Sequence, residues 1–257
     1  GHLFKKLSKK NKVNIFPLDS EHFSIDLFFK NFKKKNNIKK ILITASGGPF
    51  FNKKLSTFSK IKFKEAILHP KWKMGYKNSI DSATLCNKCL ELIEAHYLFE
   101  IPYEMLDISI HPQALVHSII NFNNYTSILN YFYPDMFIPI FNFINYHYNT
   151  KIQIKQKNPF VFNSVDNFDF YDVNLKRYPI VKLFENLNKN SSSEIIKFNT
   201  ANEVAVENFK LGKIKFNEIH DFIDNSLSLD FTHKTNSIND IIVFQNYLKN
   251  LIKNENL

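Results

Sequence analysis

Residues 13–45 read VNIFPLDSEHFSIDLFFKNFKKKNNIKKILITA, and they decide the fold class. Val13–Leu18 and Lys39–Ala45 are apolar runs with the length of short buried strands, and polar or glycine-containing sequence follows each of them. Between them, Glu21–Lys34 places its apolar side chains at helical spacing. This order of elements predicts a β-α-β arrangement.

Three further strands are predicted over Met105–Ile110, Ala114–Phe122 and Tyr125–Tyr133. The last two flank Asn123-Asn124, a pair that tolerates the positive φ angles of a tight hairpin turn. We therefore expect an α+β fold. It consists of a catalytic domain with a mixed sheet and flanking helices, followed by a linker and a C-terminal helical bundle.

The linker and the bundle are read from the second half of the chain. Residues 151–171 carry Lys, Gln, Asn, Pro and Asp without periodicity, as a linker does. Four helical patterns follow, and Gly212 suits the C′ cap of the second. They cover Tyr178–Asn190, Ser193–Leu211, Lys215–Leu229 and Ser237–Asn254. This pattern predicts a small four-helix bundle.

The composition is that of a globular protein, because 257 residues with 44% hydrophobic content can bury a sizeable core. The net charge of +10 rests on lysine, since Arg177 is the single arginine. Bidentate recognition of bases favours arginine, so a Lys-rich nucleic-acid-binding module that stacks bases on Phe and Tyr is kept only as an alternative. No apolar run predicts a leader or a membrane span.

The two cysteines, Cys86 and Cys89, have C-x-x-C spacing. A structural zinc site needs four ligands, and the sequence has no second pair. A redox motif is expected near a βαβ turn, whereas this pair lies in a helical pattern. We therefore interpret both cysteines as buried packing residues of a protein in a reducing compartment.

A polar stripe runs along residues 81–94, DSATLCNKCLELIE, because spacings of three and four return to one helix face. The stripe contains Thr84, Asn87, Lys88, Glu91 and Glu94. Near the helix start, Ser82, Asn87 and Lys88 can donate hydrogen bonds to an anion, while Glu91 lies about 4–5 Å further along the axis. The alternative is an amphipathic helix with a solvated polar face.

Two carboxylates and a hydroxyl, on Asp19, Ser20 and Glu21, follow the first predicted strand directly. The carboxyl ends of strands are where open α/β sheets bind ligands. Together with Glu91 they supply three carboxylates, which suit a hard cation such as Mg²⁺ or Mn²⁺. The alternative is that Asp19 only caps the next helix.

Three other segments carry candidate ligand contacts. Residues 46–48, Ser-Gly-Gly, follow a predicted strand and let backbone N–H groups approach a phosphate, unless they form only a tight turn. His69, Trp72 and Met74 lie in a segment bracketed by Pro and Gly that can form a lid, although a lone Trp is often a core residue. His111 follows a strand and can contact an anion or be a structural histidine.

Seven motifs occur in the same order as in 1-deoxy-D-xylulose 5-phosphate reductoisomerase, and the sequence resembles that family over residues 13–257. The motifs are Leu-Asp-Ser-Glu-His, Ser-Gly-Gly-Pro-Phe, His-Pro-x-Trp-x-Met-Gly, Ser-x-Asp-Ser-Ala-Thr-x-x-Asn-Lys, Ile-His-Pro-Gln, Tyr-Pro-Asp-Met and Asn-x-Ala-Asn-Glu. The resemblance implies four parts. Residues 1–18 are the end of a nucleotide domain and an entry strand, 19–150 a catalytic metal-binding domain, 151–172 a linker and 173–257 a C-terminal four-helix domain.

The resemblance also implies roles for individual residues. The metal ligands for Mg²⁺ or Mn²⁺ are Asp19, Glu21 and Glu91. The substrate-binding residues are Ser20, Glu21, Ser46, His69, Ser82, Asn87, Lys88 and Glu91, and those that hold its phosphate are Ser46, Ser82, Asn87 and Lys88. The residues beside the NADPH nicotinamide are Met74 and Gly75. The catalytic residues are Glu21, His69, Trp72, Glu91 and His111.

The family converts 1-deoxy-D-xylulose 5-phosphate to 2-C-methyl-D-erythritol 4-phosphate with NADPH, in the non-mevalonate route to isoprenoids. The resemblance implies a homodimer in the cytoplasm or a plastid-type organelle, without a nucleic-acid or membrane partner. The NADPH-binding domain is expected to be missing, and the chain alone to be inactive. A metal-dependent phosphosugar isomerase without reduction is a further alternative. Residues Asn199–Glu203 receive no role from the sequence.

Overall fold

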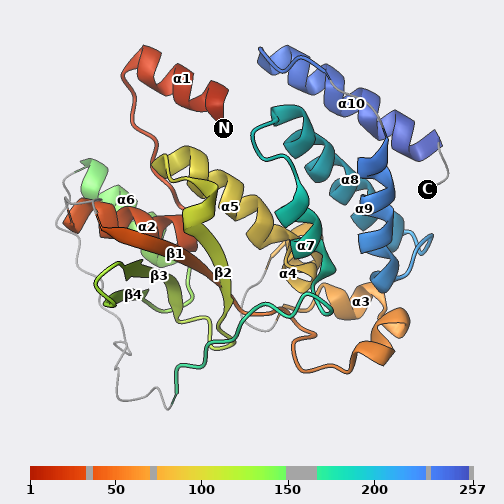
Figure 1. Cartoon of the computed structure of the whole chain (residues 1–257), viewed down its shortest axis with the longest axis horizontal. Coiled ribbons are helices and arrows are strands. Elements are labelled where there is room, and N and C mark those ends of the chain that lie inside the picture. The colour runs from red at the N-terminus through yellow and green to blue at the C-terminus, as the bar shows by residue number, and fades with distance from the viewer. Residues whose placement is uncertain (33–36, 70–73, 149–166, 230–232, 255–257) are drawn as a thin grey trace. The chain divides into compact units, whose positions relative to one another are not determined.

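The structure is a computed structural model of the 257 residues (Figure 1), and it describes residues 1–32, 37–69, 74–148, 167–229 and 233–254. These residues form two compact units that interleave along the chain. Unit 1 consists mainly of Lys5–Ser46 and Glu91–Val173, and unit 2 mainly of Gly47–Leu90 and Asn174–Leu257. The four-part division expected from the sequence stays a prediction.

Unit 1 contains a four-stranded mixed sheet with the order β2-β1-β3-β4. Strand β1 (Ile38–Ala45) pairs in parallel with β2 (Leu106–Ile110) and antiparallel with β3 (Val116–Phe122), which pairs antiparallel with β4 (Ser127–Tyr131). Strand β1 has a partner on both sides, and its apolar side chains are buried except that of Leu42, which is half-buried. The expected mixed sheet is confirmed.

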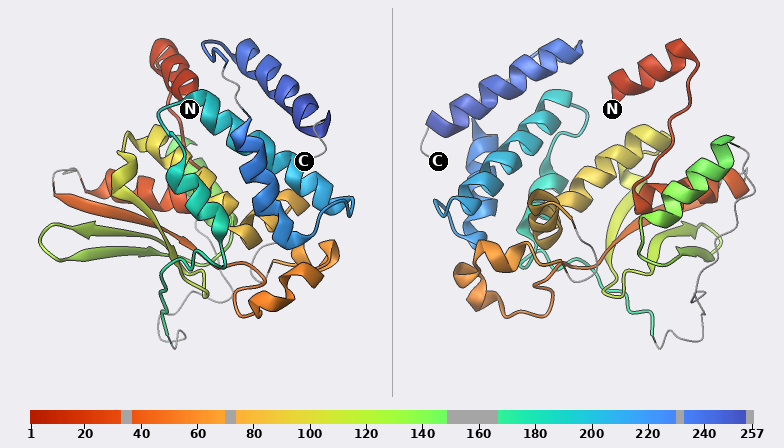
Figure 2. Two further views of the ribbon diagram at one scale, coloured as in Figure 1. Left: turned by 45° about the vertical axis from the view of Figure 1, so that its right-hand side comes forward. Right: turned by 180° about the vertical axis from the view of Figure 1, so that it is seen from behind.

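Helix α2 (Ser20–Asn31) packs against β3 and β4 in the same unit (Figure 2). It buries Phe23, Ile25 and Phe28, as the helical spacing predicted. A buried hydrogen bond of 2.6 Å between the hydroxyls of Ser24 and Ser118 fixes the helix on the sheet. Unit 1 also contains η2 (Tyr103–Met105), α6 (Phe137–Tyr148) and all of α1 (His2–Asn11) from Lys5 onward.

The strand predicted over Val13–Leu18 is wrong, because these residues form neither a strand nor a helix. Val13 and Leu18 are exposed, and Pro17 has no N–H to donate to a ladder. In addition, β2 and β3 already occupy both sides of β1. The parallel partner of β1 is therefore β2, and the predicted β-α-β unit is a helix followed by a strand.

The predicted hairpin joins β3 and β4, but its positive φ angle lies on Tyr125 and not on the Asn pair. Tyr125 has a φ of 65°, and its N–H donates to the Phe122 carbonyl at 3.2 Å. The Asn124 side chain accepts hydrogen bonds from the N–H and the hydroxyl of Thr126. The loop therefore has three residues and ends in a left-handed residue, which is a common hairpin form.

Unit 2 is mainly helical, and the four helical patterns predicted for its C-terminal part are confirmed. Its elements are η1 (Leu55–Lys60), α3 (Phe63–Ala66), α4 (Tyr76–Thr84), α7 (Pro179–Asn186), α8 (Ser192–Lys210), η4 (Phe216–Glu218), α9 (Ile219–Ser228) and α10 (Ile238–Asn254). Helix α8 packs against both α9 and α10. As predicted, Gly212 is the C′ residue of this helix: it has a φ of 73° and donates its N–H to the Phe209 carbonyl.

Most of the linker predicted over residues 151–171 lies outside the described residues, because 149–166 are not described. Its described end is tied to unit 1, because Tyr171 forms an isolated antiparallel bridge with Ile110. Among the residues that the structure describes, none of the helices combines the length and the apolarity needed to cross a bilayer.

Candidate metal and anion site

The residues 81–94 form two helices and not one. Helix α4 ends at Thr84, Leu85 has a left-handed φ of 63°, and α5 (Cys86–Phe99) starts directly after it. The Thr84 hydroxyl accepts the N–H of Cys86, and the Leu85 carbonyl accepts that of Cys89, so a new helix begins at the break. Helix α5 begins in unit 2 and ends in unit 1.

The polar stripe is largely buried. Thr84 and Lys88 are each 8% exposed and Glu91 only 3%, whereas Glu94 is exposed. The alternative of a solvated amphipathic face is therefore wrong for most of the stripe. Burying an ammonium and a carboxylate is costly unless charged or hydrogen-bonding groups compensate them, so the stripe has the character of a site. Cys86 and Cys89 are buried and are not joined in a disulfide, which confirms their packing role, and burial raises the pKa of the Cys86 thiol.

The structure brings together the three carboxylates singled out in the sequence. One oxygen each of Asp19, Glu21 and Glu91 lies within 4.8 Å of the others, all in unit 1. Asp19 is exposed at the N-cap position of α2, Glu21 lies in the first turn of that helix, and Glu91 comes from α5. The side chain of Asp19 makes no capping hydrogen bond, so helix capping does not explain its presence.

The chemistry of this cluster is that of a hard cation site. Three carboxylates at this separation repel one another, and the burial of Glu91 strengthens the repulsion. A divalent cation removes the repulsion, and an all-oxygen ligand set favours Mg²⁺ or Mn²⁺. The Ser20 hydroxyl, which is buried, donates a hydrogen bond to the Glu21 carboxylate and holds it in place.

A second cluster shares Asp19 and adds His22 and Glu94, again with one ligand atom each within 4.8 Å. His22 is 2% exposed, and its Nε2 lies 2.9 Å from the Glu91 carbonyl oxygen. Its Nδ1 lies 3.6 Å from a carboxylate oxygen of Glu94. A nitrogen ligand suits softer metals, so the two clusters differ in the ion they favour.

The candidate anion ligands gather around the break between α4 and α5. Ser82 lies in the last turn of α4, and Asn87 and Lys88 lie in the first turn of α5, the end of a helix that favours an anion. All three belong to unit 2. The His69 Nε2 lies 3.0 Å from the Ser82 hydroxyl, within hydrogen-bonding distance. This arrangement has the features of an anion site: a helix start, two neutral donors and an ammonium group.

The loop after β1 packs tightly on the last turn of α4. Gly47 and Gly48 have φ angles of 82° and 69°, and a Cβ atom on Gly48 would lie 2.8 Å from the Ala83 Cα. Both the backbone conformation and the close approach therefore require glycine at Gly48. Ser46 directly precedes the two glycines.

Arg177 and Tyr178 hold this loop, and sequence reasoning missed their role. Arg177 Nη1 donates to the carbonyls of Phe50 and Lys53 at 2.8 Å each, and the Tyr178 hydroxyl donates to the Gly47 carbonyl at 2.8 Å. Burial raises the pKa of Tyr178 to about 12. The signal for Arg177 was available, because it is the single arginine in a chain that otherwise uses lysine.

The remaining candidates are placed as follows. Met74 is half-buried, and Gly75 is exposed at the N-cap of α4, while Trp72 falls in 70–73, outside the described residues. His111 is fully buried directly after β2, with its Nδ1 2.9 Å from the Asp169 carbonyl and its ring stacked on Phe170. These contacts hold the His111 ring in one orientation, and its role toward a ligand stays a prediction.

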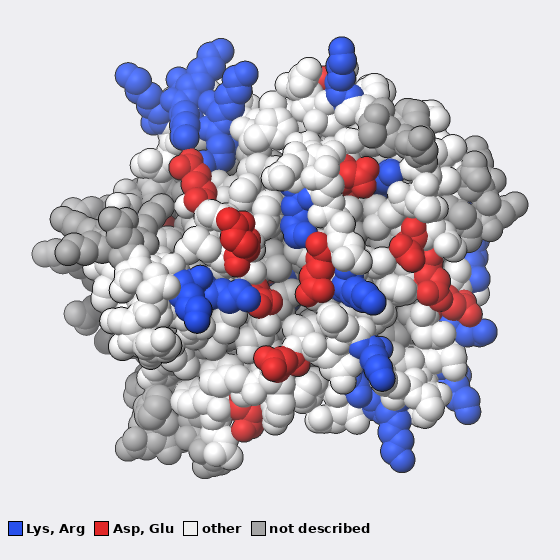
Figure 3. Space-filling model, viewed as in Figure 1, with Lys and Arg blue, Asp and Glu red and all other residues white. Residues whose placement is uncertain are grey.

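The surface charge bears on the nucleic-acid alternative. Figure 3 shows basic side chains gathered over α1, whose sequence contains four lysines, whereas acidic and basic side chains mix over the rest of that face. The described residues of this face offer one compact basic group and not a continuous basic surface along which a phosphate backbone would lie.

The fold and the site define an α+β protein with a carboxylate cluster of the type that binds a divalent cation. Models for the C-terminal domains of 1-deoxy-D-xylulose 5-phosphate reductoisomerase match residues 15–99 and 133–251, which together are more than half of the chain. The chain belongs to the 1-deoxy-D-xylulose 5-phosphate reductoisomerase family.

Curated relatives of that name include the protein of Pelagibacter ubique, 44% identical over 85% of this chain and 55% of the relative. The protein of Clostridium kluyveri is 37% identical over 99% of this chain and 65% of the relative. The chain thus spans between about half and two thirds of the length of these relatives.

Solved structures give the same result. A crystal structure of DOX-P reductoisomerase in complex with NADPH, fosmidomycin and magnesium matches with a TM-score of 0.85 and 30% identity, over 98% of this chain and 65% of that one. The reductoisomerase from Zymomonas mobilis in complex with NADPH matches with a TM-score of 0.85 and 29% identity, over 99% of this chain and 65% of that one.

Proposed function

We propose that this chain provides the metal-binding and phosphate-binding residues of a 1-deoxy-D-xylulose 5-phosphate reductoisomerase. The observation that carries the proposal is the convergence of the Asp19, Glu21 and Glu91 carboxylates within 4.8 Å. The names of the relatives and the NADPH and magnesium in the related structures support it.

In this proposal Asp19, Glu21 and Glu91 hold one Mg²⁺ or Mn²⁺ ion. When bound, the ion acts as a Lewis acid that polarises the ketone and a neighbouring hydroxyl of the substrate. Ser20 and Glu21 contact substrate hydroxyls, and the buried Ser20 orients the Glu21 carboxylate. The bound substrate thereby presents its reacting carbons in a fixed orientation.

The substrate phosphate is held by Ser46, Ser82, Asn87 and Lys88. Such an anchor supplies binding energy away from the reacting carbons, which can be used to orient them. Lys88 and Glu91 are three residues apart on α5, so one helix carries a residue of each set. His69, Trp72 and Met74 belong to a lid, Gly75 lies beside the nicotinamide, and His111 lines the pocket.

The reaction proposed is the NADPH-dependent conversion of 1-deoxy-D-xylulose 5-phosphate to 2-C-methyl-D-erythritol 4-phosphate, in a cytoplasmic homodimer. The chain by itself is expected not to turn over. It spans only part of its relatives' length, and it contains no G-x-G-x-x-G dinucleotide motif. Oxidation of NADPH by the purified chain, supplied with substrate and Mg²⁺, would contradict this part of the proposal.

The binding functions are tested by a calorimetric titration of the chain with fosmidomycin in the presence of Mn²⁺. Lys88→Ala removes the ammonium group, so we expect its affinity for fosmidomycin, a phosphonate, to fall roughly tenfold or more while Mn²⁺ still binds. Lys189→Ala, which removes a lysine elsewhere in unit 2, is the control. If Lys88→Ala binds fosmidomycin as the unmodified chain does, the phosphate role of Lys88 is wrong.

A further inference from the structure

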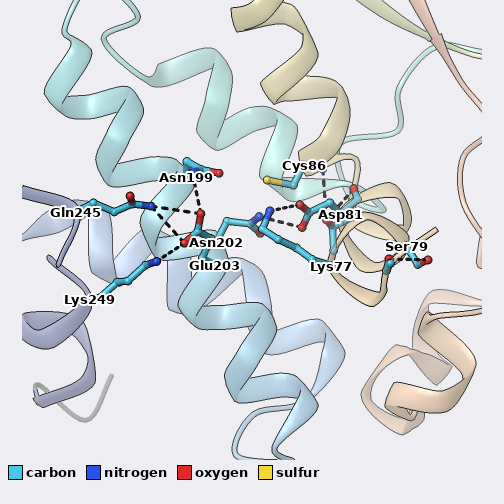
Figure 4. Close-up of polar contacts among 11 residues, drawn as sticks. Lys77, Ser79, Asp81, Cys86, Asn199, Asn202, Glu203, Gln245 and Lys249 are labelled. Atoms are coloured by element: carbon cyan, nitrogen blue, oxygen red, sulfur yellow. Dashed lines mark hydrogen bonds and ion pairs between the residues drawn. The ribbon is translucent and has the colours of Figure 1, made fainter. Parts of the chain in front are cut away.

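A buried polar contact in unit 2 joins α8 to α4 (Figure 4). The Asn202 Nδ2 donates to Asp81 Oδ1 at 2.9 Å, and the two side chains are 0% and 1% exposed. Asn202 belongs to the Asn-x-Ala-Asn-Glu motif, to which the sequence assigned no role. The amide orientation is fixed, because the opposite orientation would place two acceptor oxygens against each other.

Asp81 needs this contact because it is a buried carboxylate. Burial raises its pKa, while its ion pair with Lys77 at 2.5 Å and the bond from Asn202 oppose that rise. Lys77 lies one turn earlier on the same helix, so it compensates charge without fixing α4 to another element. Asn202 makes the bond that ties the last turn of α4 to α8. A second bond between the two helices, from Tyr76 to Glu207, lies at the first turn of α4 and is exposed.

The last turn of α4 is the part of the helix on which the anion site depends. Ser82 follows Asp81 directly, and the Gly48 backbone packs against Ser82 and Ala83. Leu85 then takes its left-handed conformation, after which α5 begins with the turn that contains Asn87 and Lys88. A displacement of this turn would therefore move three donors of the site together.

We propose that Asn202 is a positioning residue for the anion site: through its hydrogen bond to Asp81, it fixes the turn that presents Ser82, Asn87 and Lys88 to the phosphate group of a ligand. This inference rests on the proposed function, because it assumes that these three residues bind phosphate. It gives a helix of the C-terminal bundle a part in ligand binding without any direct contact with the ligand.

The neighbouring residue provides a matched control. Glu203, also on α8, accepts hydrogen bonds from Asn199 and from Gln245, and it forms an ion pair of 2.7 Å with Lys249 of α10 (Figure 4). These contacts lie within the helical bundle, and among the described residues Glu203 makes no hydrogen bond with α4, although its charge acts on Lys77 and Asp81 from a distance. Glu203→Gln therefore changes a polar side chain on the same helix, one position further on, without removing the bond to Asp81.

The first measurement is the affinity of the full chain for inorganic phosphate and for Mn²⁺, by calorimetry. We expect Asn202→Ala to weaken phosphate binding by about tenfold, and Glu203→Gln to change it by less than about twofold. Mn²⁺ affinity should stay unchanged in both, because the carboxylate cluster lies in unit 1. Asp81→Asn keeps an acceptor for Asn202 and should retain phosphate affinity within about threefold. Equal losses in Asn202→Ala and Glu203→Gln, or none in Asn202→Ala, would overturn the inference.

The second measurement is amide hydrogen exchange without ligand, which separates this inference from the proposed function. Asn202→Ala should speed exchange in residues 82–88 and leave β1 and β2 unchanged. If exchange in 82–88 does not change, Asn202 does not position this turn. If it changes as expected but the unmodified chain binds no phosphate, the proposed phosphate site is what fails. If the alanine variant does not fold, Asn202→Ser takes its place. This variant also removes the amide, and the serine side chain is too short for its hydroxyl to reach Asp81.

Discussion

Glu91 and Glu94 lie on one helix but belong to different ligand clusters, which makes them a matched pair of residues. Glu91→Gln removes a charged ligand from the all-oxygen cluster, so we expect Mn²⁺ affinity to fall about tenfold or more. Glu94→Gln should leave the affinity within about twofold. Electron paramagnetic resonance, which detects free Mn²⁺, measures the Mn²⁺ affinity of both variants. A larger loss in Glu94→Gln would assign the ion to the cluster with His22.

Tyr178 makes stability depend on pH in the alkaline range. Its pKa is raised from 10.0 to about 12 in the folded state, so the unfolded chain loses the phenolic proton first. Ionisation of Tyr178 therefore leaves the free energy of unfolding unchanged below pH 10 and lowers it as pH rises toward 12. The total decrease from this group is roughly 2–3 kcal/mol at most. Tyr178→Phe should be less stable by about 1 kcal/mol at neutral pH, since the Gly47 carbonyl loses its donor.

Urea unfolding at about pH 9 and about pH 11 checks this prediction. The free energy of unfolding of the unmodified chain should fall more between these two conditions than that of Tyr178→Phe. Tyr125→Phe, which removes a hydroxyl from a side chain that is 96% exposed, is the control for losing one phenol. An identical fall in the unmodified chain and in Tyr178→Phe would show that Tyr178 makes no contribution to this pH dependence.

The metal ligands could be singled out from the sequence because oxygen ligands have a chemistry that is visible in the residue type. Asp19, Glu21 and Glu91 are such residues, and the structure places them together. Asn202 and Tyr178 could not be found in this way. Their contacts join segments more than a hundred residues apart, and an amide or a phenol is equally suited to many other positions.

At the scale of elements, the β3–β4 hairpin contains a residue with a strained backbone conformation, and a substitution can remove this strain. Tyr125 has a left-handed φ of 65°, and its side chain is 96% exposed, so little packing is lost on its removal. Tyr125→Gly should raise the free energy of unfolding by about 0.5–1 kcal/mol. Asn123→Gly, at an exposed position of the same loop without positive φ, should not raise it. Urea denaturation compares the two, and a less stable Tyr125→Gly would show that the turn is unstrained.

Local sequence patterns predicted most helices and strands. They failed where residues distant in the sequence determine the conformation of a segment. Strands β1 to β4 and the C-terminal helices follow their sequence patterns, because burial of one face sets the periodicity. Val13–Leu18 has the same kind of pattern, but both sides of β1 are already paired. The break at Leu85 is not marked by a glycine or proline in the sequence, and the Gly48 backbone, which is distant in the sequence, packs against α4 just before it.

At the scale of the whole molecule, the sequence predicted the fold class but contained no sign of the two interleaved units. The boundary between the units falls inside α5, between Leu90 and Glu91, where the helical pattern continues without interruption. Composition changes mark a boundary only where a linker occurs, and here a continuous helix crosses it. The carboxylate cluster belongs to unit 1, and Ser82, Asn87 and Lys88 belong to unit 2.

The most direct test of the central claim is anomalous X-ray diffraction from crystals of the chain grown with Mn²⁺. We predict one strong manganese peak within about 2–2.5 Å of carboxylate oxygens of Asp19, Glu21 and Glu91. A peak ligated by His22 and Glu94 in place of Glu21 and Glu91, or no peak at the carboxylates in crystals that bind manganese elsewhere, would contradict the account.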